Sequence, residues 1–106
     1  MPEGTVVVWE RDGLWEARLA RELPGVRVRG ARSAKDARER LTPPAALVIV
    51  AATAGPWLDA GPWEAPAVLV ADGAEDAWWL AAGVAAVFGE AVSAGRVAAA
   101  VQGLLG

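Results

Sequence analysis

Apolar runs and amphipathic stretches alternate along the 106-residue chain. Apolar runs cover residues 5–9 and 67–71, and a longer one covers residues 45–52. Uninterrupted apolar character of this kind is typical of strands in a parallel sheet that helices cover on both faces. Residues 26–29 instead alternate valine with arginine, which predicts a half-exposed strand at a sheet edge. A short fifth strand is predicted over residues 85–88.

The two segments that connect the first three predicted strands have the periodicity of helices. Trp15, Leu19 and Leu23 recur at four-residue spacing and predict a helix over residues 13–23 with one buried face. The following Pro24 ends that helix. A near capping box at residues 33–36 predicts a second helix with its cap at Ser33. We expect this helix to end at Pro43 and Pro44. Its expected inward positions are Ala34, Ala37 and Leu41.

Two further helices are predicted in the second half of the chain. One covers residues 75–82 and is closed by Gly83. The other begins after Ser93 and continues to about residue 105. Its expected buried face consists of Val97, Val101 and Leu104.

Residues 53–65 depart from this pattern. The unit Ala-Gly-Pro-Trp occurs twice, at 54–57 and at 60–63. Two Gly-Pro pairs so close together disfavour a long helix, because proline lacks the backbone N–H that a helix interior needs. We therefore expect a short helical turn or a loop here.

The order of elements predicts an α/β fold. Parallel strands joined by helices form right-handed crossovers, with helices on both faces of the sheet. Five strands in this length favour a flavodoxin-like three-layer sandwich with strand order 2-1-3-4-5, in which the third helix is shortened or replaced by a loop. A Rossmann half is the topological alternative. We expect residues 1–106 to form a single domain.

Composition removes several kinds of chemistry. The chain has no cysteine and no histidine, which excludes disulfides, thiolate metal sites and imidazole acid–base catalysis. It contains neither a glycine-rich dinucleotide motif nor a phosphate-binding loop with lysine. We find no pair of carboxylates at a catalytic spacing. We therefore expect no enzymatic activity, no bound metal and no cofactor.

The charge distribution argues against nucleic acid and membrane partners. The net charge is −3, with a small positive excess in residues 1–44 and a negative one in residues 45–106. Because acids are interleaved with the basic residues, a mixed solvated surface is the better interpretation. No apolar run reaches the roughly 20 residues of a membrane helix, and the first residues lack signal-peptide features, so we expect a cytoplasmic protein. Abundant arginine and alanine indicate a GC-rich genome, such as that of a thermophile.

Over nearly its whole length the chain resembles a bacterial response-regulator receiver domain. Residues 7–10 stand where a receiver's first strand ends, and residues 33–44 resemble its second helix and the approach to strand three. Residues 66–71 resemble its fourth strand, and residues 83–92 its glycine-led fifth strand. The resemblance implies a role in two-component signalling.

The resemblance also implies a phosphorylation pocket, and here its residues have changed. In receivers an aspartate ending strand three accepts phosphate, acids ending strand one hold Mg²⁺, a hydroxyl ends strand four and a lysine ends strand five. The matching positions here carry Trp9 and Glu10 for the acids, Ala51 for the acceptor, Ala71 for the hydroxyl and Glu90 for the lysine. Only Glu10 keeps its chemical type. The resemblance therefore implies a pseudo-receiver that cannot be phosphorylated.

Two residual forms of chemistry stay open near that pocket. Glu10 and Glu90, with Asp12 and Asp72 nearby, would make a cation site if their oxygens converged. We favour the alternative that they are solvated acids on a loop-rich face. Thr53 is the nearest hydroxyl, and we do not expect it to replace the acceptor.

The six tryptophans are the other unusual feature of the chain. We expect Trp15 to pack under the first helix and Trp9 to fill the vacated phosphorylation pocket. Trp57 and Trp63 are expected to cover the sheet where the third helix is short, and partner binding is their alternative role.

Adjacent tryptophans predict an interface. Trp78 and Trp79 point about 100° apart on a helix, so both can hardly be buried against the sheet. In receivers, the face made by the fourth helix, fifth strand and fifth helix is the usual contact surface. We expect Trp78, Trp79 and Arg96 to bind a protein partner or a second copy there. The alternative is that both tryptophans lie flat on their own domain.

The sequence thus favours a non-phosphorylatable, receiver-like signalling or regulatory module that acts by protein–protein interaction. The alternative is a small-molecule sensor at the C-terminal ends of the strands, where small residues would leave space. These are Ala51, Ala52, Ala54, Gly55 and Ala71.

Overall fold

The computed structural model describes residues 4–42, 44–50, 63, 65–71, 84–89 and 91–105. Within these residues it contains five strands and three helices, in an order that alternates as expected up to the third strand. The elements are β1 (Thr5–Trp9), α1 (Leu14–Glu22), β2 (Arg27–Ala31), α2 (Ala34–Arg40), β3 (Ala45–Val50), β4 (Ala67–Val70), β5 (Ala86–Phe88) and α5 (Ala94–Leu105).

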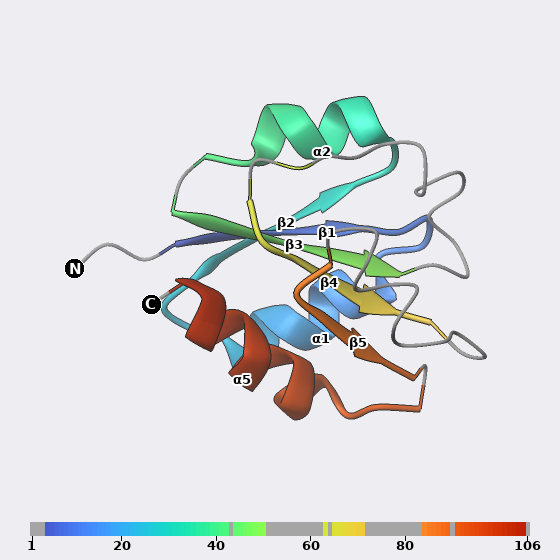
Figure 1. Ribbon diagram of the computed structural model, residues 1–106, viewed down its shortest axis with the longest axis vertical. Coiled ribbons are helices and arrows are strands. Elements are labelled where there is room, and N and C mark those ends of the chain that lie inside the picture. The colour runs from blue at the N-terminus through green and yellow to red at the C-terminus, as the bar shows by residue number, and fades with distance from the viewer. Residues whose placement is uncertain are drawn as a thin grey trace.

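The five strands form one parallel sheet of order β2-β1-β3-β4-β5. This order confirms the flavodoxin-like α/β arrangement. Helix α2 covers one face of the sheet, and α1 and α5 cover the other (Figure 1). Of residues 53–65, where the shortened third helix or loop was expected, the structure describes only residues 63 and 65, and the helix predicted over residues 75–82 lies outside the described residues. None of the helices in the described part of the chain is long and apolar enough to cross a membrane.

Two apolar layers explain the uninterrupted runs of the central strands. In β1, Val6 and Val8 pack in the layer under α1 and α5, which we call the α1/α5 layer. Val7 and Trp9 pack in the layer under α2, the α2 layer. Because successive side chains of a strand point to opposite faces, a strand covered on both sides must be apolar at every position.

The expected helix faces and caps are present. Trp15, Leu19 and Leu23 are all buried in the α1/α5 layer. Ser33 accepts a hydrogen bond at its Oγ from the N–H of Asp36 at 3.1 Å, which caps α2. Ala34 and Ala37 of α2 pack in the α2 layer, as does Leu41 directly after the helix. The residues of α5 in the α1/α5 layer include Val97, Ala98, Val101 and Leu104.

The edge strand β2 is displaced by one to two residues from its predicted position. The sequence predicted residues 26–29, whereas the strand covers Arg27–Ala31. Val26 belongs to the preceding turn, because its N–H donates to the carbonyl of Leu23 at 3.0 Å. Pairing with β1 then continues to Ala31, which lies beside Trp9.

Candidate functional site

The residues singled out from the sequence divide into a described and an undescribed group. Trp9 is the last residue of β1, and Glu10 and Ala71 directly follow β1 and β4. Arg96 is exposed in the first turn of α5. The others lie outside the described residues, namely Ala51, Glu90, Trp78 and Trp79.

Glu10 is a structural cap for α1. Although it follows the last residue of β1, only 3% of its surface is exposed. Its Oε1 accepts the N–H of Trp15 at 3.0 Å, and its Oε2 accepts the N–H of Glu16 at 2.7 Å. The helix begins after Gly13, which has φ 77° and provides no side-chain cap. Glu10 therefore satisfies two of the N–H groups that the first turn of a helix leaves without partners.

This position corrects one expectation and supports another. Glu10 was expected to be a solvated acid, which is wrong because its carboxylate is buried on the first turn of α1. Asp12 is exposed, as expected, and accepts a long bond of 3.5 Å from the N–H of Leu14. The available signal for the cap was a glycine before the helix with an acid three residues upstream of it. Among the described residues, no group of three or more acids converges as a metal site would require.

Burial raises the pKa of the Glu10 carboxyl above 4.5. The hydrogen bonds from Trp15 and Glu16 act in the opposite direction, since they stabilise the charged form. The nearby carboxylates of Asp12 and Glu16 raise the pKa further. Desolvation outweighs the two donors, so the pKa of the Glu10 carboxyl lies above its usual value.

Trp9 lies at the centre of an aromatic contact in the α2 layer. Its side chain is 2% exposed. Its ring meets that of Trp63 in an edge-to-face arrangement, with centroids 5.8 Å apart. The guanidinium of Arg38 lies 4.5 Å from the Trp63 ring centre. Trp63 therefore packs on the sheet as expected, whereas Trp57 lies outside the described residues.

One polar atom of this cluster has no partner among the described residues. It is the Nε1 of Trp9, which is buried. Beyond β4, Ala71 is also buried in the α2 layer, and its N–H donates to the carbonyl of Phe88 at 2.8 Å. At the ends of β1 and β4, the side chains on the α2 side are therefore buried and apolar. That Trp9 fills a vacated phosphorylation pocket stays a prediction, because Ala51 and Glu90 are not described.

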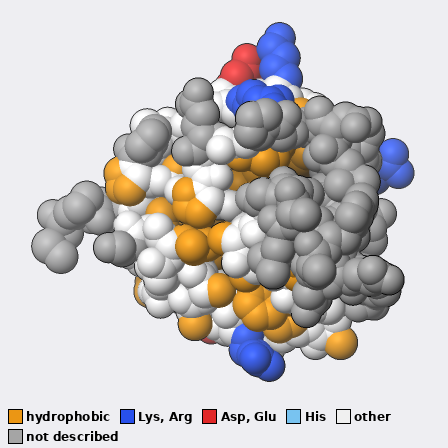
Figure 2. All heavy atoms as spheres, in the orientation of Figure 1, with side chains coloured by type: hydrophobic (Ala, Val, Ile, Leu, Met, Phe, Trp, Pro, Cys, Tyr) orange, Lys and Arg blue, Asp and Glu red, His pale blue; other side chains and the backbone are white. Residues whose placement is uncertain are grey.

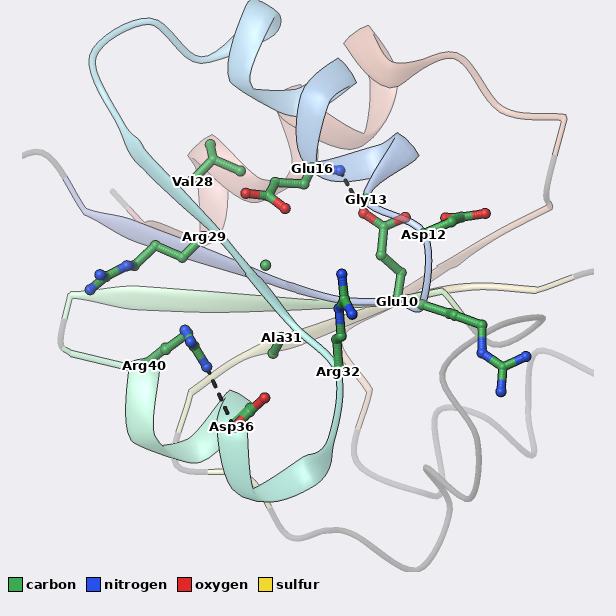
Figure 3. A pocket seen from close by; sticks show the side chains of 12 residues that line it. Glu10, Asp12, Gly13, Glu16, Val28, Arg29, Ala31, Arg32, Asp36 and Arg40 are labelled. Carbon is green, nitrogen blue, oxygen red and sulfur yellow. Dashed lines mark hydrogen bonds and ion pairs between the residues drawn. The ribbon is translucent and has the colours of Figure 1, made fainter.

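A groove of about 410 Å³ follows the outer edge of β2, between α1 and α2 (Figure 3). Sequence reasoning missed it, although the alternating valine and arginine residues already marked this strand as an edge. Its charged lining consists of Glu10, Arg11, Asp12, Glu16, Arg29, Arg32, Asp36 and Arg40.

No protein-family model matches the sequence, and a comparison with curated proteins finds no match. The receiver resemblance therefore depends on the order and spacing of the elements and on the residues at the strand ends.

Proposed function

We propose that this protein is a receiver-like regulatory module that works by binding another protein and does not accept a phosphoryl group. The observation that carries the proposal is the position of Glu10. In receivers an acid at this place holds Mg²⁺, whereas here each carboxylate oxygen accepts a backbone N–H of α1. A cation at Glu10 would have to compete with two charge-assisted hydrogen bonds.

The neighbouring strand ends support the same proposal. Trp9 stands at the place of the other metal-binding acid and Ala71 at the place of the hydroxyl, and both side chains are buried in the α2 layer. Phosphoryl transfer needs hard oxygen ligands and a nucleophile at these positions. Packed apolar side chains favour one fixed arrangement instead. Partner binding, rather than covalent modification, would then determine the state of the module.

The second edge of the sheet offers a surface for such a partner. β5 is an edge strand, and Ala86, Val87 and Phe88 are each partly exposed. Figure 2 shows hydrophobic side chains across the middle of this side of the molecule, between α2 and α5. Partly exposed apolar residues and arginine are both common in protein interfaces. We propose that Arg96, with Trp78 and Trp79, takes part in this contact.

The proposal is tested by measuring association of the intact protein. We would compare the wild type with the double variant Trp78→Ala/Trp79→Ala and with Arg96→Glu, using sedimentation velocity and cross-linking in extracts of the source cells. Arg21→Glu, at an exposed position of α1, is the matched charge control. We expect the first two variants to lose association that the control retains. Unchanged association in all variants would show that this face is not the interface.

A ligand sensor is the second candidate, and the Nε1 of Trp9 favours it. This donor is buried at the C-terminal end of β1, where flavodoxin-like folds bind ligands, and no described residue provides an acceptor for it. A thermal-shift screen with nucleotides and metabolites tests the idea. A ligand that stabilises the wild type but not Trp9→Phe would support a sensor, and a flat response across the set would count against it.

A further inference from the structure

The outer edge of β2 carries backbone groups that face away from the sheet. The N–H of Arg27 donates to the carbonyl of Gly4 at 3.2 Å, and the carbonyl of Ala31 accepts the N–H of Glu10 at 3.1 Å. Alternate residues of a parallel strand bond to opposite sides. Because Arg27 and Ala31 face β1, the N–H and C=O groups of Val28 and Gly30 face outward.

The neighbouring helices do not close this edge. The groove of about 410 Å³ includes residues 28–31 of β2 in its lining, with Glu16 of α1 on one side and Asp36 and Arg40 of α2 on the other (Figure 3). Val28 and Gly30 are both partly exposed. A further strand laid in the groove would therefore reach the outward-facing backbone groups.

The two faces of this edge differ in chemistry. Ala31 packs in the α2 layer and Val28 packs against the α1/α5 layer. Since side chains alternate along a strand, Arg27 and Arg29 project on the α2 side, and both are exposed. On the α1 side the edge presents apolar Val28, and the carboxylate of Glu16 lies against Gly30.

Acids and arginines are equally numerous in the groove, and some residues of each kind have interactions within the chain. Both oxygens of Glu10 accept backbone N–H groups, and Asp36 pairs with Arg40 at 3.6 Å. Among the described residues, no ion pair engages Arg29 or Arg32. The groove therefore offers positive charge on its α2 side to an incoming partner.

We propose that the β2 edge binds an extended acidic segment of a partner protein as an added strand. Asp or Glu at alternate positions of the segment meets Arg27 and Arg29, and uncharged residues between them pack on Val28. The inference rests on the proposed function, because it assumes a protein partner, and it adds a second contact on the edge opposite β5. A second copy fits poorly, since pairing two β2 edges would place the arginines of both copies on the same side.

The direct test uses a labelled peptide of about ten residues in which Glu alternates with Val and Thr. Fluorescence anisotropy with the intact protein measures its affinity. One control peptide has the same composition with all Glu residues grouped at one end, and another has Lys in place of Glu. We expect the alternating acidic peptide to bind at least about tenfold more tightly than either control.

Protein variants locate the contact. Arg29→Glu should weaken peptide binding at least about tenfold, whereas Arg21→Glu on the surface of α1 should change it less than about twofold. Val28→Pro removes an outward N–H without removing a bond to β1, and proline is tolerated at such edge positions. It should abolish binding. Hydrogen exchange of the wild-type protein gives a measurement that does not depend on the folding of that variant. Bound peptide should slow amide exchange at Val28 and Gly30.

Several results would overturn the inference. These are equal binding of the grouped peptide, equally strong competition by a single-stranded oligonucleotide, unchanged exchange at Val28 and Gly30, or a dimer that Val28→Pro dissociates.

The two proposals can fail separately. If the alternating peptide fails to bind while association still depends on Trp78 and Trp79, this inference fails and the proposed function stands. If the peptide binds while those variants change nothing, the β2 contact stands and the β5 interface fails.

Discussion

At the scale of single residues, Glu10 connects the end of β1 to the start of α1. Replacing it by alanine leaves the N–H groups of Trp15 and Glu16 without acceptors in a buried or partly buried place. We predict that Glu10→Ala lowers the free energy of unfolding by about 1–3 kcal/mol, measured by urea denaturation. Asp12→Ala is the control and should cost clearly less, because Asp12 is exposed and its bond is long. Equal losses would contradict the capping role.

The raised pKa of Glu10 predicts a particular pH dependence. Between pH 4.5 and the higher pKa of the folded state, the folded protein holds a proton that the unfolded chain has released. The contribution of Glu10 to stability is therefore full below pH 4.5 and is lost as the pH rises through the folded-state pKa. Glu10→Gln should remove this loss, so the difference in stability between the two proteins should change across that range. If urea denaturation gave the same difference in free energy of unfolding between the two proteins at every pH, burial would not raise the pKa of this carboxyl.

Trp9 offers the second prediction at this scale. Trp9→Asp restores the residue type that receivers carry, but it places a carboxylate in the α2 layer, where the tryptophan is 2% exposed. We predict a loss of at least about 3 kcal/mol in the free energy of unfolding. Trp9→Phe keeps an apolar ring and should cost less. A Trp9→Asp protein as stable as the wild type, with new affinity for Mg²⁺, would show that the pocket is not filled by this side chain.

At the scale of elements, two glycines near α5 have different surroundings. Gly4, just before β1, lies against the end of α5, whereas Gly103 within α5 has open space beside it. A Cβ on Gly4 would lie 2.6 Å from Cδ2 of Leu105 and 3.0 Å from the carbonyl oxygen of Pro44, whereas a Cβ on Gly103 would meet nothing. Gly4→Ala should therefore destabilise the protein by about 1–3 kcal/mol. Gly103→Ala, inside α5, should stabilise it by about 0.5–1 kcal/mol. Thermal unfolding measures both, and shifts of the same sign would contradict the packing.

The same scale shows what a sequence can predict. The apolar runs of β1, β3 and β4 and the four-residue spacing in α1 are local patterns, so they predicted the buried layers. Backbone hydrogen bonding at Val26 and Gly30 depends on the turn after α1 and on register with β1, which moved β2 from its predicted position. Family likeness matched Glu10 to a metal-binding position, and we expected a solvated acid there, but its actual role depends on where α1 begins. The groove could not be predicted, because β2, α1 and α2 form it together.

At the scale of the whole molecule, the two edges of the described sheet differ in chemistry. The β2 edge carries arginines and outward backbone groups, and the β5 edge carries partly exposed apolar residues. The strand ends between them contain Trp9 and Ala71, which pack in the α2 layer. This arrangement has the scaffold of a flavodoxin-like fold and places its proposed contacts on the surface.

The intact mass of the protein after incubation with acetyl phosphate and Mg²⁺ tests the central claim most directly. A receiver that retains its acceptor aspartate, treated in parallel, shows that the donor is active. The account predicts that the mass of this protein does not change while that of the control rises. A stoichiometric increase of about 80 Da, the mass of one phosphoryl group, would contradict it.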